Sequence, residues 1–292
     1  MVQLQRLAIA PQQQNEGEIV LTPPQQHYLC RVLRLRKGDR FIAMDGRGNW
    51  WLSELEASLT QAKIIESLCV QTELLGAVTL MAAMPKGNGF DEVVYQATEL
   101  GVAGIIPVKS DRTLLNPSPQ KVERWRRLTK EAAEQSERQI VPTVFDPVDF
   151  TASLQLTATP DAHRYICVAR GEAPLLLNCL SAQPLNLKTS SSPSTQRVWS
   201  KPVGDGEDKG DKEDKGDKED KEESSFQPTT DDHTRTQASV VIATGPEGGW
   251  TEAEVEQATA AGFQAVSLGR RILRAVTAPI VALSLVASIF DN

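Results

Sequence analysis

Residues 240–249 read Val-Val-Ile-Ala-Thr-Gly-Pro-Glu-Gly-Gly, and residues 266–274 read Val-Ser-Leu-Gly-Arg-Arg-Ile-Leu-Arg. Each stretch is a strand-like apolar run that ends in a glycine-bearing turn. Glycine at the end of a strand allows the backbone to approach a ligand closely. In an open α/β sheet, two such turns at the carboxyl ends of neighbouring strands form a ligand crevice.

The same alternation of strand and helix extends upstream and downstream of these two turns. Strand-like runs lie at 78–84, 105–108, 165–168, 240–243 and 265–268, and helical patterns lie at 90–100, 119–138 and 279–290. Thr251 and Glu254 have the spacing of a capping box, which predicts a further helix directly after the first glycine turn. Strands that alternate with helices predict a mostly parallel sheet with helices on both faces.

The first 75 residues follow a different pattern. Short apolar stretches separated by turn residues lie at 18–21, 40–44, 50–55 and 63–68. Short strands with frequent turns are typical of a small β-barrel. We therefore expect a β-barrel over residues 1–75 and an α/β domain over residues 76–292.

A low-complexity segment interrupts the α/β pattern. Residues 210–215 read Gly-Asp-Lys-Glu-Asp-Lys, and residues 216–221 repeat them. Almost nothing here could fill a core, so we expect a disordered insert from about residue 187 to residue 237. Residues 201–223, with six lysines and eleven acids, carry five of the seven net negative charges of the chain. The remainder is only slightly acidic, which leaves room for a basic patch that contacts nucleic acid.

Composition and length predict a soluble globular protein. The 292 residues are 40% hydrophobic and 24% charged, and no apolar run reaches the ~20 residues that a membrane helix needs. The amino terminus lacks the long apolar core of a signal peptide. The four cysteines and three histidines have no disulfide or metal-binding spacing, so we expect a cytoplasmic protein without a metal site.

The Gly-Pro-Glu-Gly-Gly sequence at 245–249 allows two interpretations. It is either a tight turn between strand and helix or a ligand loop, and its residues alone favour the ligand loop only slightly. It lacks both the Gly-Lys-Ser/Thr ending of a Walker loop and the glycine spacing of a Rossmann fingerprint. Glu247 would repel phosphate, which disfavours a nucleotide-triphosphate site and favours a cationic ligand.

The second turn also allows two interpretations. Arg270, Arg271 and Arg274 surround an Ile-Leu pair, and the following residues begin an apolar helix. The stretch is either a surface loop with two buried aliphatic residues or a ligand loop. In the ligand loop, the aliphatic pair would contact a ring and the arginines would contact phosphate or base. The start of the helix would add free backbone donors to such a site.

Several upstream motifs join these two loops in a fixed order. They are His27-Tyr28-Leu29-Cys30-Arg31-Val32-Leu33-Arg34, Lys86-Gly87, Ala97-Thr98-Glu99-Leu100-Gly101-Val102, Ile106-Pro107-Val108, Ser110-Asp111-Arg112 and Glu134-Gln135-Ser136-Glu137-Arg138. With these motifs the chain resembles the bacterial 16S rRNA uridine-N3 methyltransferase family. This family is a branch of the SPOUT superfamily of trefoil-knotted methyltransferases. The resemblance covers nearly everything outside the insert.

The resemblance implies a PUA-like amino-terminal barrel, a knotted catalytic domain, a homodimer and S-adenosylmethionine as cofactor. On the family pattern, the two glycine-bearing loops hold this cofactor in the knot. The residues that would line its pocket are Thr244, Gly245, Glu247, Gly248, Leu268, Gly269, Ile272, Leu273 and Arg274. Val276 stands where the family usually has an acidic residue, so a side-chain contact at that position is lost.

The densest basic cluster outside the insert lies in the expected barrel. Residues 27–40 carry an excess of four positive charges. Taken alone, this run is somewhat better explained as a solvated barrel edge. Joined to an RNA-modifying domain, it becomes a candidate for phosphate contact. The residues expected to contact RNA are His27, Arg31, Arg34, Arg36, Lys37 and Arg40, together with Lys86 and Arg138.

The reaction implied by the resemblance is methyl transfer to N3 of uridine 1498 in 16S rRNA of the small ribosomal subunit. The target nitrogen must be unpaired and must lose its proton. A nearby arginine would favour the anionic uracil, and we expect Arg112 and Arg274 to have this catalytic role. Two alternatives stay open. One is a SPOUT RNA methyltransferase with another target, such as a ribose 2′-oxygen or another base, and the other is a non-catalytic rRNA-binding assembly factor.

Overall fold

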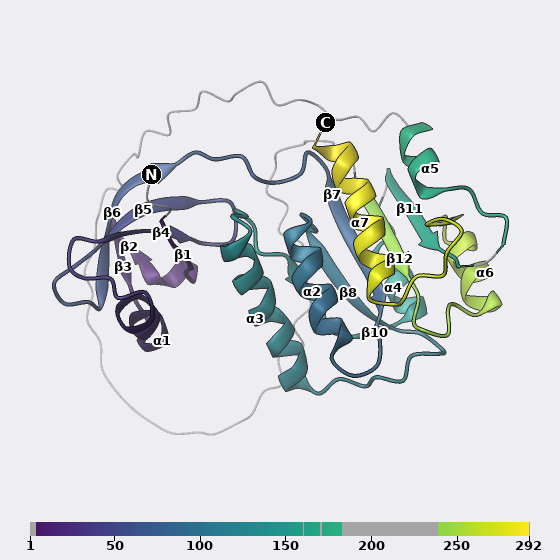
Figure 1. The fold of residues 1–292 in the computed structure, drawn as a ribbon, viewed down its shortest axis with the longest axis horizontal. Helices are drawn as coiled ribbons and strands as arrows, with labels where there is room; N and C mark the ends of the chain where they lie inside the picture. The colour runs from purple at the N-terminus through teal and green to yellow at the C-terminus, as the bar shows by residue number, and fades with distance from the viewer. Residues whose placement is uncertain (1–3, 160, 170, 183–238, 292) are drawn as a thin grey trace, which may run out of the picture. The chain divides into compact units, whose positions relative to one another are not determined.

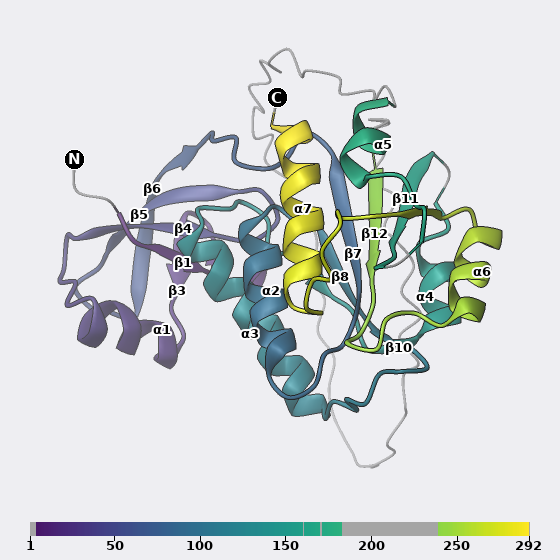
Figure 2. The same cartoon turned by 45° about the vertical axis from the view of Figure 1, so that its right-hand side comes forward.

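Two β-sheets organise the computed structural model of the chain (Figures 1 and 2). The structure describes residues 4–159, 161–169, 171–182 and 239–291. The insert expected at 187–237 lies outside the described residues. The described parts of the chain form one compact unit.

The first sheet has six strands in the order β1-β4-β5-β6-β3-β2. Its strands are β1 (Arg6–Ala8), β2 (Gln14–Asn15), β3 (Glu18–Val20), β4 (Arg40–Met44), β5 (Trp50–Leu55) and β6 (Gln61–Leu68). All neighbours are antiparallel except β1 and β4. Between β3 and β4, helix α1 (Pro23–His27) continues into the π-helical turn η2 (Tyr28–Val32). Buried apolar side chains from strands and helix, among them Ile19, Leu29 and Phe41, form the core of this region.

The second sheet has seven strands, and every pair in it is parallel. The strand order is β10-β8-β7-β12-β11-β13, with β9 beside β8. Its strands are β7 (Ala77–Ala83), β8 (Gly104–Lys109), β9 (Thr143–Val144), β10 (Val148–Asp149), β11 (Ala162–Cys167), β12 (Ser239–Thr244) and β13 (Gln264–Val266). Strand β12 therefore lies between β7 and β11 in the centre of the sheet.

Helices cover both faces of the parallel sheet, as Figures 1 and 2 show. They are α2 (Gly89–Glu99), α3 (Pro119–Gln135), α4 (Phe150–Leu156), α5 (Leu176–Ala182), α6 (Glu252–Ala260) and α7 (Thr277–Phe290). Leu80 of β7 packs in one core with α2, α3, α5 and α7, whereas Met81 packs in another with α4 and α6. Successive side chains of a strand point to opposite faces, which is why one strand supplies both cores.

The predicted fold class is confirmed. The strand-like runs and the helical patterns correspond to β7, β8, β11, β12, β13, α2, α3 and α7. The predicted capping box begins α6, with both of its hydrogen bonds present. Sequence periodicity missed α4, α5 and the two-residue strands β9 and β10, because such short elements contain too few residues to establish a period.

The end of helix α3 packs against the first sheet. Ala133 lies in a small core with Ile42, Met44 and Trp50. The carboxylate of Glu134 accepts a hydrogen bond from the backbone N–H of Ala8 at 2.6 Å. The first sheet and its loops therefore contact the end of helix α3, and they also contact the segment that follows it, as in the ion pair of Arg6 with Glu137 at 2.7 Å.

Candidate active site

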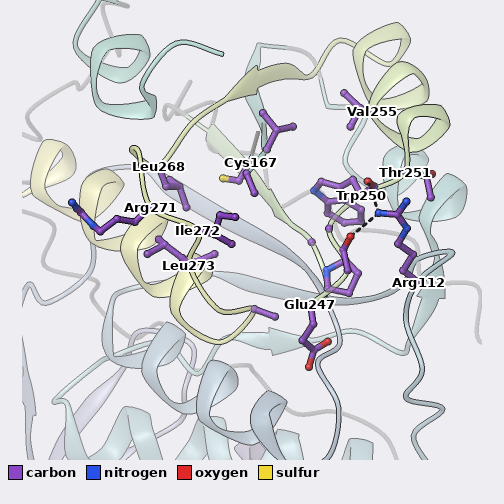
Figure 3. A pocket seen from close by; sticks show the side chains of 18 of the residues that line it. Arg112, Cys167, Glu247, Trp250, Thr251, Val255, Leu268, Arg271, Ile272 and Leu273 are labelled. Carbon is purple, nitrogen blue, oxygen red and sulfur yellow. Dashed lines mark hydrogen bonds between the residues drawn. The ribbon is translucent and has the colours of Figure 1, made fainter. Parts of the chain in front are cut away.

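A cavity of about 390 Å³ opens at the carboxyl ends of β11, β12 and β13 (Figure 3). Its walls are the end of β11, the glycine loop (residues 245–249) and the arginine loop (residues 268–274). Seven of the nine residues predicted to hold a cofactor line it: Gly245, Glu247, Gly248, Leu268, Gly269, Ile272 and Leu273. The two loops therefore meet around one cavity, at the sheet edge where parallel strands place their carboxyl ends.

Thr244 and Arg274 complete the predicted cofactor set but do not line the cavity. Thr244 ends β12 and is buried, and its Oγ1 has no hydrogen-bond partner among the described residues. Arg274 is exposed, and its carbonyl oxygen accepts the N–H groups of Thr277 and Ala278 at 2.9 Å each. Arg274 thus supports the start of α7 through its backbone.

Two glycines of the glycine loop make room for other side chains. A Cβ atom at Gly245 would lie 3.3 Å from the indole of Trp250, and one at Gly248 would lie 3.0 Å from Cδ of Arg112. Contacts this short force the neighbouring atoms to move. Gly245 and Gly248 therefore allow Trp250 and Arg112 to lie directly against the loop backbone, which is a more specific role than general backbone freedom.

Arg112 lies at the rim of the cavity and holds the glycine loop. Its Nη1 donates hydrogen bonds to the carbonyl oxygens of Gly248 at 2.6 Å and of Trp250 at 3.4 Å (Figure 3). The other guanidinium nitrogens make no hydrogen bond to the described residues, and the side chain is exposed. One arm of this predicted catalytic residue therefore fixes the loop, while the rest of its charge stays available at the cavity.

Glu254 connects the start of α6 to the loop that carries Arg112. Its side chain is only 3% exposed. One carboxylate oxygen accepts the N–H of Asp111 at 3.0 Å, and the other accepts the N–H of Thr251 at 2.7 Å. The capping box was predictable from the sequence, but the bond to Asp111 joins positions more than a hundred residues apart and gave no sequence signal.

Glu247 connects the glycine loop to the loop after β7. Its Oε1 accepts the backbone N–H of Lys86 at 3.0 Å. Lys121 of α3 holds the same loop from its other side, since its Nζ donates to the Gly87 carbonyl at 3.1 Å and to Oδ1 of Asn88 at 2.9 Å. Lys86 itself has an exposed side chain, as a residue expected to contact RNA needs.

The arginine loop presents apolar side chains to the cavity. Leu268, Ile272 and Leu273 lie together in Figure 3, and Arg271 points away from Ile272 and Leu273. Ile272 is 65% exposed, which is unusual for an isoleucine at a cavity wall. Gly269 has a φ of +115°, a conformation that favours glycine, and it allows the loop to turn directly after β13.

Sequence reasoning missed Trp250 and Cys167 in the cavity wall. Trp250 directly follows the glycine loop and packs on Phe150 with ring centroids 5.0 Å apart. Cys167 ends β11, the neighbour of β12, so its place was predictable once the strand order was known. Burial raises the pKa of the Cys167 thiol to about 12. The thiol is therefore protonated at neutral pH and forms an apolar wall, not a nucleophile.

The basic residues predicted for RNA contact at 27–40 lie on the surface of the amino-terminal part of the chain, which contains the first sheet. His27, Arg31, Arg34, Arg36, Lys37 and Arg40 are all exposed. Only Arg40 among them has an ion pair with a described residue, at 3.3 Å from Glu54. Exposed pairs of this kind contribute little free energy and compete weakly with a phosphate.

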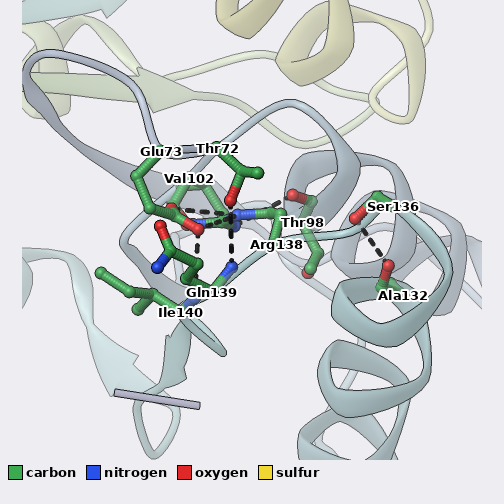
Figure 4. A network of polar contacts seen from close by, with 9 residues as sticks. All are labelled: Thr72, Glu73, Thr98, Val102, Ala132, Ser136, Arg138, Gln139 and Ile140. Carbon is green, nitrogen blue, oxygen red and sulfur yellow. Dashed lines mark hydrogen bonds and ion pairs between the residues drawn. The ribbon is translucent and has the colours of Figure 1, made fainter. Parts of the chain in front are cut away.

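Arg138 has a different position from the one predicted (Figure 4). Its side chain is buried, its Nε and Nη2 bond the carboxylate of Glu73, and its Nη1 donates to the carbonyl oxygens of Thr98 and Val102 at 3.0 and 2.8 Å. A guanidinium that is buried, with each of its nitrogens engaged inside the protein, is not presented to RNA. The predicted RNA contact is corrected to a structural role in joining α2, α3 and the segment before β7.

The described part of the chain has no metal-binding cluster, no disulfide and no membrane-spanning helix. No group of three or more His, Cys, Asp or Glu side chains that could hold a metal ion occurs there. The four cysteines are free thiols. None of the helices in these residues is long and apolar enough to cross a membrane.

The sequence matches two protein families along most of its length. The RNA methyltransferase domain family matches residues 72–191 and 214–287, and the RNA methyltransferase PUA domain family matches residues 21–66. The PUA match bears out the PUA-like amino-terminal region that the sequence motifs implied. The two matches together cover the parallel sheet and, in the first sheet, β4, β5 and most of β6.

Curated relatives and a solved structure agree with these matches. Ribosomal RNA small subunit methyltransferase E of Synechocystis sp. is 40% identical over 98% of this chain and 78% of its own length. The Bacillus subtilis protein of the same name is 30% identical over 91% of this chain and 88% of its own length. The structure of a ribosomal RNA small subunit methyltransferase E from Neisseria gonorrhoeae, bound to S-adenosyl methionine, shares the fold. Its TM-score is 0.70 at 24% identity, and the alignment covers 99% of this chain and 98% of that one.

Proposed function

The chain belongs to the ribosomal RNA small subunit methyltransferase E family, and we propose that it methylates N3 of uridine 1498 in 16S rRNA with S-adenosylmethionine as methyl donor. Methyl transfer to ribosomal RNA is the activity of the family. The target atom and the roles of individual residues are the proposal. The observation that carries it is the cavity between the glycine and arginine loops, with Arg112 at its rim.

The residues around this cavity fit S-adenosylmethionine. A volume of about 390 Å³ lies within the range of small-molecule sites. Leu268, Ile272 and Leu273 offer apolar contacts to an adenine ring, and the exposed surface of Ile272 would be covered by it. Glu247, whose second carboxylate oxygen has no partner among the described residues, places negative charge at the wall, and this suits a cationic ligand.

The bound cofactor supplies an electrophilic methyl group on a sulfonium. The task of the protein is then to align the uracil and to favour loss of the N3 proton. The fixed charge of Arg112 stabilises a uracil anion and so lowers the pKa of N3. The hydrogen bonds from Arg112 to Gly248 and Trp250 hold that charge in place before the substrate arrives. Arg274 is a second candidate for this role, from outside the cavity wall.

The remaining parts of the proposal concern RNA binding and assembly. We propose that residues 1–75 form the RNA-binding module, with the exposed basic residues at 27–40 as its phosphate contacts, and that residues 76–292 form the catalytic domain. A phosphate-binding surface on one module and a cofactor cavity on the other would place a single RNA segment across both. We further propose a homodimer and a trefoil knot in the catalytic domain, in agreement with the family resemblance of the motifs.

The test is methylation of small ribosomal subunits that lack the modification. Purified protein, S-adenosylmethionine and subunits are incubated, and the digested RNA is examined by mass spectrometry of nucleosides. We expect 3-methyluridine at one position. A 2′-O-methylated nucleoside or another methylated base would refute the target, and no transfer despite cofactor binding by calorimetry would favour an assembly factor.

A further inference from the structure

A second cavity, of about 630 Å³, lies between the first sheet and the end of helix α3. Its walls come from β1, from α1 with η2, and from the last turns of α3. None of its residues is used in the methyl transfer proposed above. Its size suits a nucleoside or another small ligand.

The floor of the second cavity is firmly built. Strand β1 is the edge of its sheet, and its Ala8 is held on both sides. The Ala8 N–H donates to Oε1 of Glu134 at 2.6 Å, and its carbonyl accepts from Nε2 of Gln25 at 2.9 Å. Gln25 is also bonded through Oε1 to Thr22 and Gln13. This part of the wall is therefore preformed.

The second cavity offers hydrogen-bonding groups that the fold does not use, and the carboxylates among them are acceptors only. Oε2 of Glu134 and the side chains of Gln5, Tyr28, Glu131 and Gln135 make no hydrogen bond to any described residue. Burial raises the pKa of the Glu134 carboxyl, and burial together with the Glu134 charge raises the pKa of the Tyr28 hydroxyl. The free oxygen of this half-buried carboxylate can accept from the N–H groups of a ligand, and a hydrogen bond to a charged acceptor is stronger than one between neutral groups.

Cations lie in this cavity and near it. Arg6 lines it, with Nη2 paired to Glu137 at 2.7 Å and a buried Nε that has no hydrogen-bond partner among the described residues. Arg31 follows Tyr28 by three residues in η2, and Arg127 and Lys130 lie four or fewer residues before Glu131 and Glu134 on α3. Each of these three cations is exposed and has no ion pair with a described residue. Exposed cations near the cavity, with donors and acceptors inside it, match a nucleotide whose base enters the cavity and whose phosphates stay outside.

We propose that the second cavity binds a base of single-stranded RNA that presents an amino group, and this inference rests on the proposed function. The carboxylate of Glu134 accepts from the amino group, Tyr28 and Gln135 complete the edge, and the rim cations contact the phosphates. Uracil carries a carbonyl oxygen where cytosine carries this amino group, so it would place an acceptor against the Glu134 carboxylate. The second cavity would therefore select a nucleotide other than the methylated uridine and so fix the position of the RNA.

The test measures base preference by fluorescence anisotropy with labelled ribonucleotide dodecamers of cytidine and of uridine, which both stay single-stranded near neutral pH. The measured quantity is the ratio of the two dissociation constants. In Glu134→Gln, Oε1 still accepts from Ala8 while an NH2 group replaces the free acceptor. We expect the preference for cytidine to fall about tenfold, the scale of one hydrogen bond to a charged group.

Three further variants keep this result interpretable. Tyr28→Phe removes only a hydroxyl and should lower the same ratio with little effect on folding. Glu123→Gln removes an acid of α3 outside the second cavity and should leave the ratio unchanged. Arg127→Gln should weaken both RNAs equally and reduce the salt dependence of binding. The proposal is overturned if the ratio of dissociation constants is unchanged in both Glu134→Gln and Tyr28→Phe. It is also overturned if these variants lose the same affinity for the cytidine and the uridine dodecamer.

Methylation and cofactor binding are measured on the same proteins. If the wild-type protein methylates its uridine but shows no base preference that depends on Glu134, the second cavity is not a base site and the proposed function stands. If the preference is present but no 3-methyluridine forms, the proposed function fails and the base site stands.

Discussion

The two loops that form the candidate active site are held in very different ways. The glycine loop is tied to two other segments, to the loop after β7 through Glu247 and Lys86, and to the loop after β8 through Arg112 and Gly248. The cap of α6 in turn holds the loop after β8 through Glu254 and Asp111. Within the arginine loop, the hydrogen bonds among described residues are those between Ser267 and Gly269 and those that begin α7. One wall of the cavity is thus preformed, and the other presents Ile272 to solvent.

This difference implies that the two loops contribute to different steps, the glycine loop to alignment of the reacting groups and the arginine loop to binding of the cofactor. A preformed wall costs no conformational entropy when the ligand binds, so it suits the part of the site that must align reacting groups. A wall with few ties can close on a ligand and gain apolar burial in return. We therefore expect changes in the glycine-loop ties to affect the rate of methyl transfer, and changes in the arginine loop to affect the affinity for the cofactor.

The largest effect is expected from Arg112→Ala. The change removes both the fixed charge at the cavity rim and the hydrogen bonds to Gly248 and Trp250. We expect the single-turnover rate of methyl transfer to fall by about 100-fold, the scale of losing one preorganised electrostatic group. Arg271→Ala, which removes an arginine that also lines the cavity but points away from Ile272, is the matched control and should retain most of the rate. Equal losses in both variants would show that charge alone, not its fixed position, matters.

Glu254→Ala should have the next largest effect. The change leaves the N–H groups of Asp111 and Thr251 without their acceptor at a partly buried position, which costs about 1 kcal/mol of unfolding free energy. Because the loop that carries Arg112 loses its tie, we also expect the single-turnover rate to fall about tenfold with RNA affinity unchanged. Glu254→Gln keeps an acceptor oxygen and should restore part of the rate at similar stability. Denaturant unfolding measures the loss of stability, and single-turnover assays measure the loss of rate. A loss of stability with a normal rate would show that Glu254 only caps α6 and does not position Arg112.

The sequence predicted the local features of the candidate active site but not the hydrogen bonds that connect its distant segments. Glycine turns at strand ends, the capping box and the alternation of strands and helices depend on short spacings, so they were readable along the chain. The contacts of Glu254 with Asp111 and of Glu247 with Lys86 join distant segments, and only the order of strands in the sheet brings them together. Cys167 lies in the cavity wall because β11 pairs with β12, and this pairing was not predictable from the local sequence.

Arg138 was predicted from a motif to contact RNA, and the structure instead gives it a structural role. The motif that contains it was correctly linked to an RNA-modifying protein, yet its guanidinium is buried against Glu73. A motif indicates that a residue type is needed at a position, but not whether the need is functional or structural. An arginine with an acidic partner 65 residues away cannot be told from a surface arginine by local sequence alone.

Gly248→Ala tests the fit between the glycine loop and Arg112 with a single methyl group. The new Cβ would lie 3.0 Å from Cδ of Arg112, so the side chain must shift. We expect the rate to fall by up to about fivefold, with a cost in stability of about 1 kcal/mol. Gly269→Ala in the arginine loop is the informative partner, because its Cβ meets no atom within 4 Å but its φ of +115° strains any other residue. Gly248→Ala should lower the rate and leave the cofactor affinity unchanged. Gly269→Ala should lower the cofactor affinity and leave the rate at saturating cofactor unchanged.

The smallest effect on folding and rate is expected from Ile272→Ala. With a side chain 65% exposed, its loss should change the unfolding free energy by no more than about 0.5 kcal/mol. Cofactor affinity should fall about fivefold by isothermal titration, because the ligand covers apolar surface that alanine no longer provides. The single-turnover rate at saturating cofactor should stay near that of the wild type. A reduced rate at saturation would show that the arginine loop also aligns the reacting groups, and the division between a preformed wall and a closing wall would then be wrong.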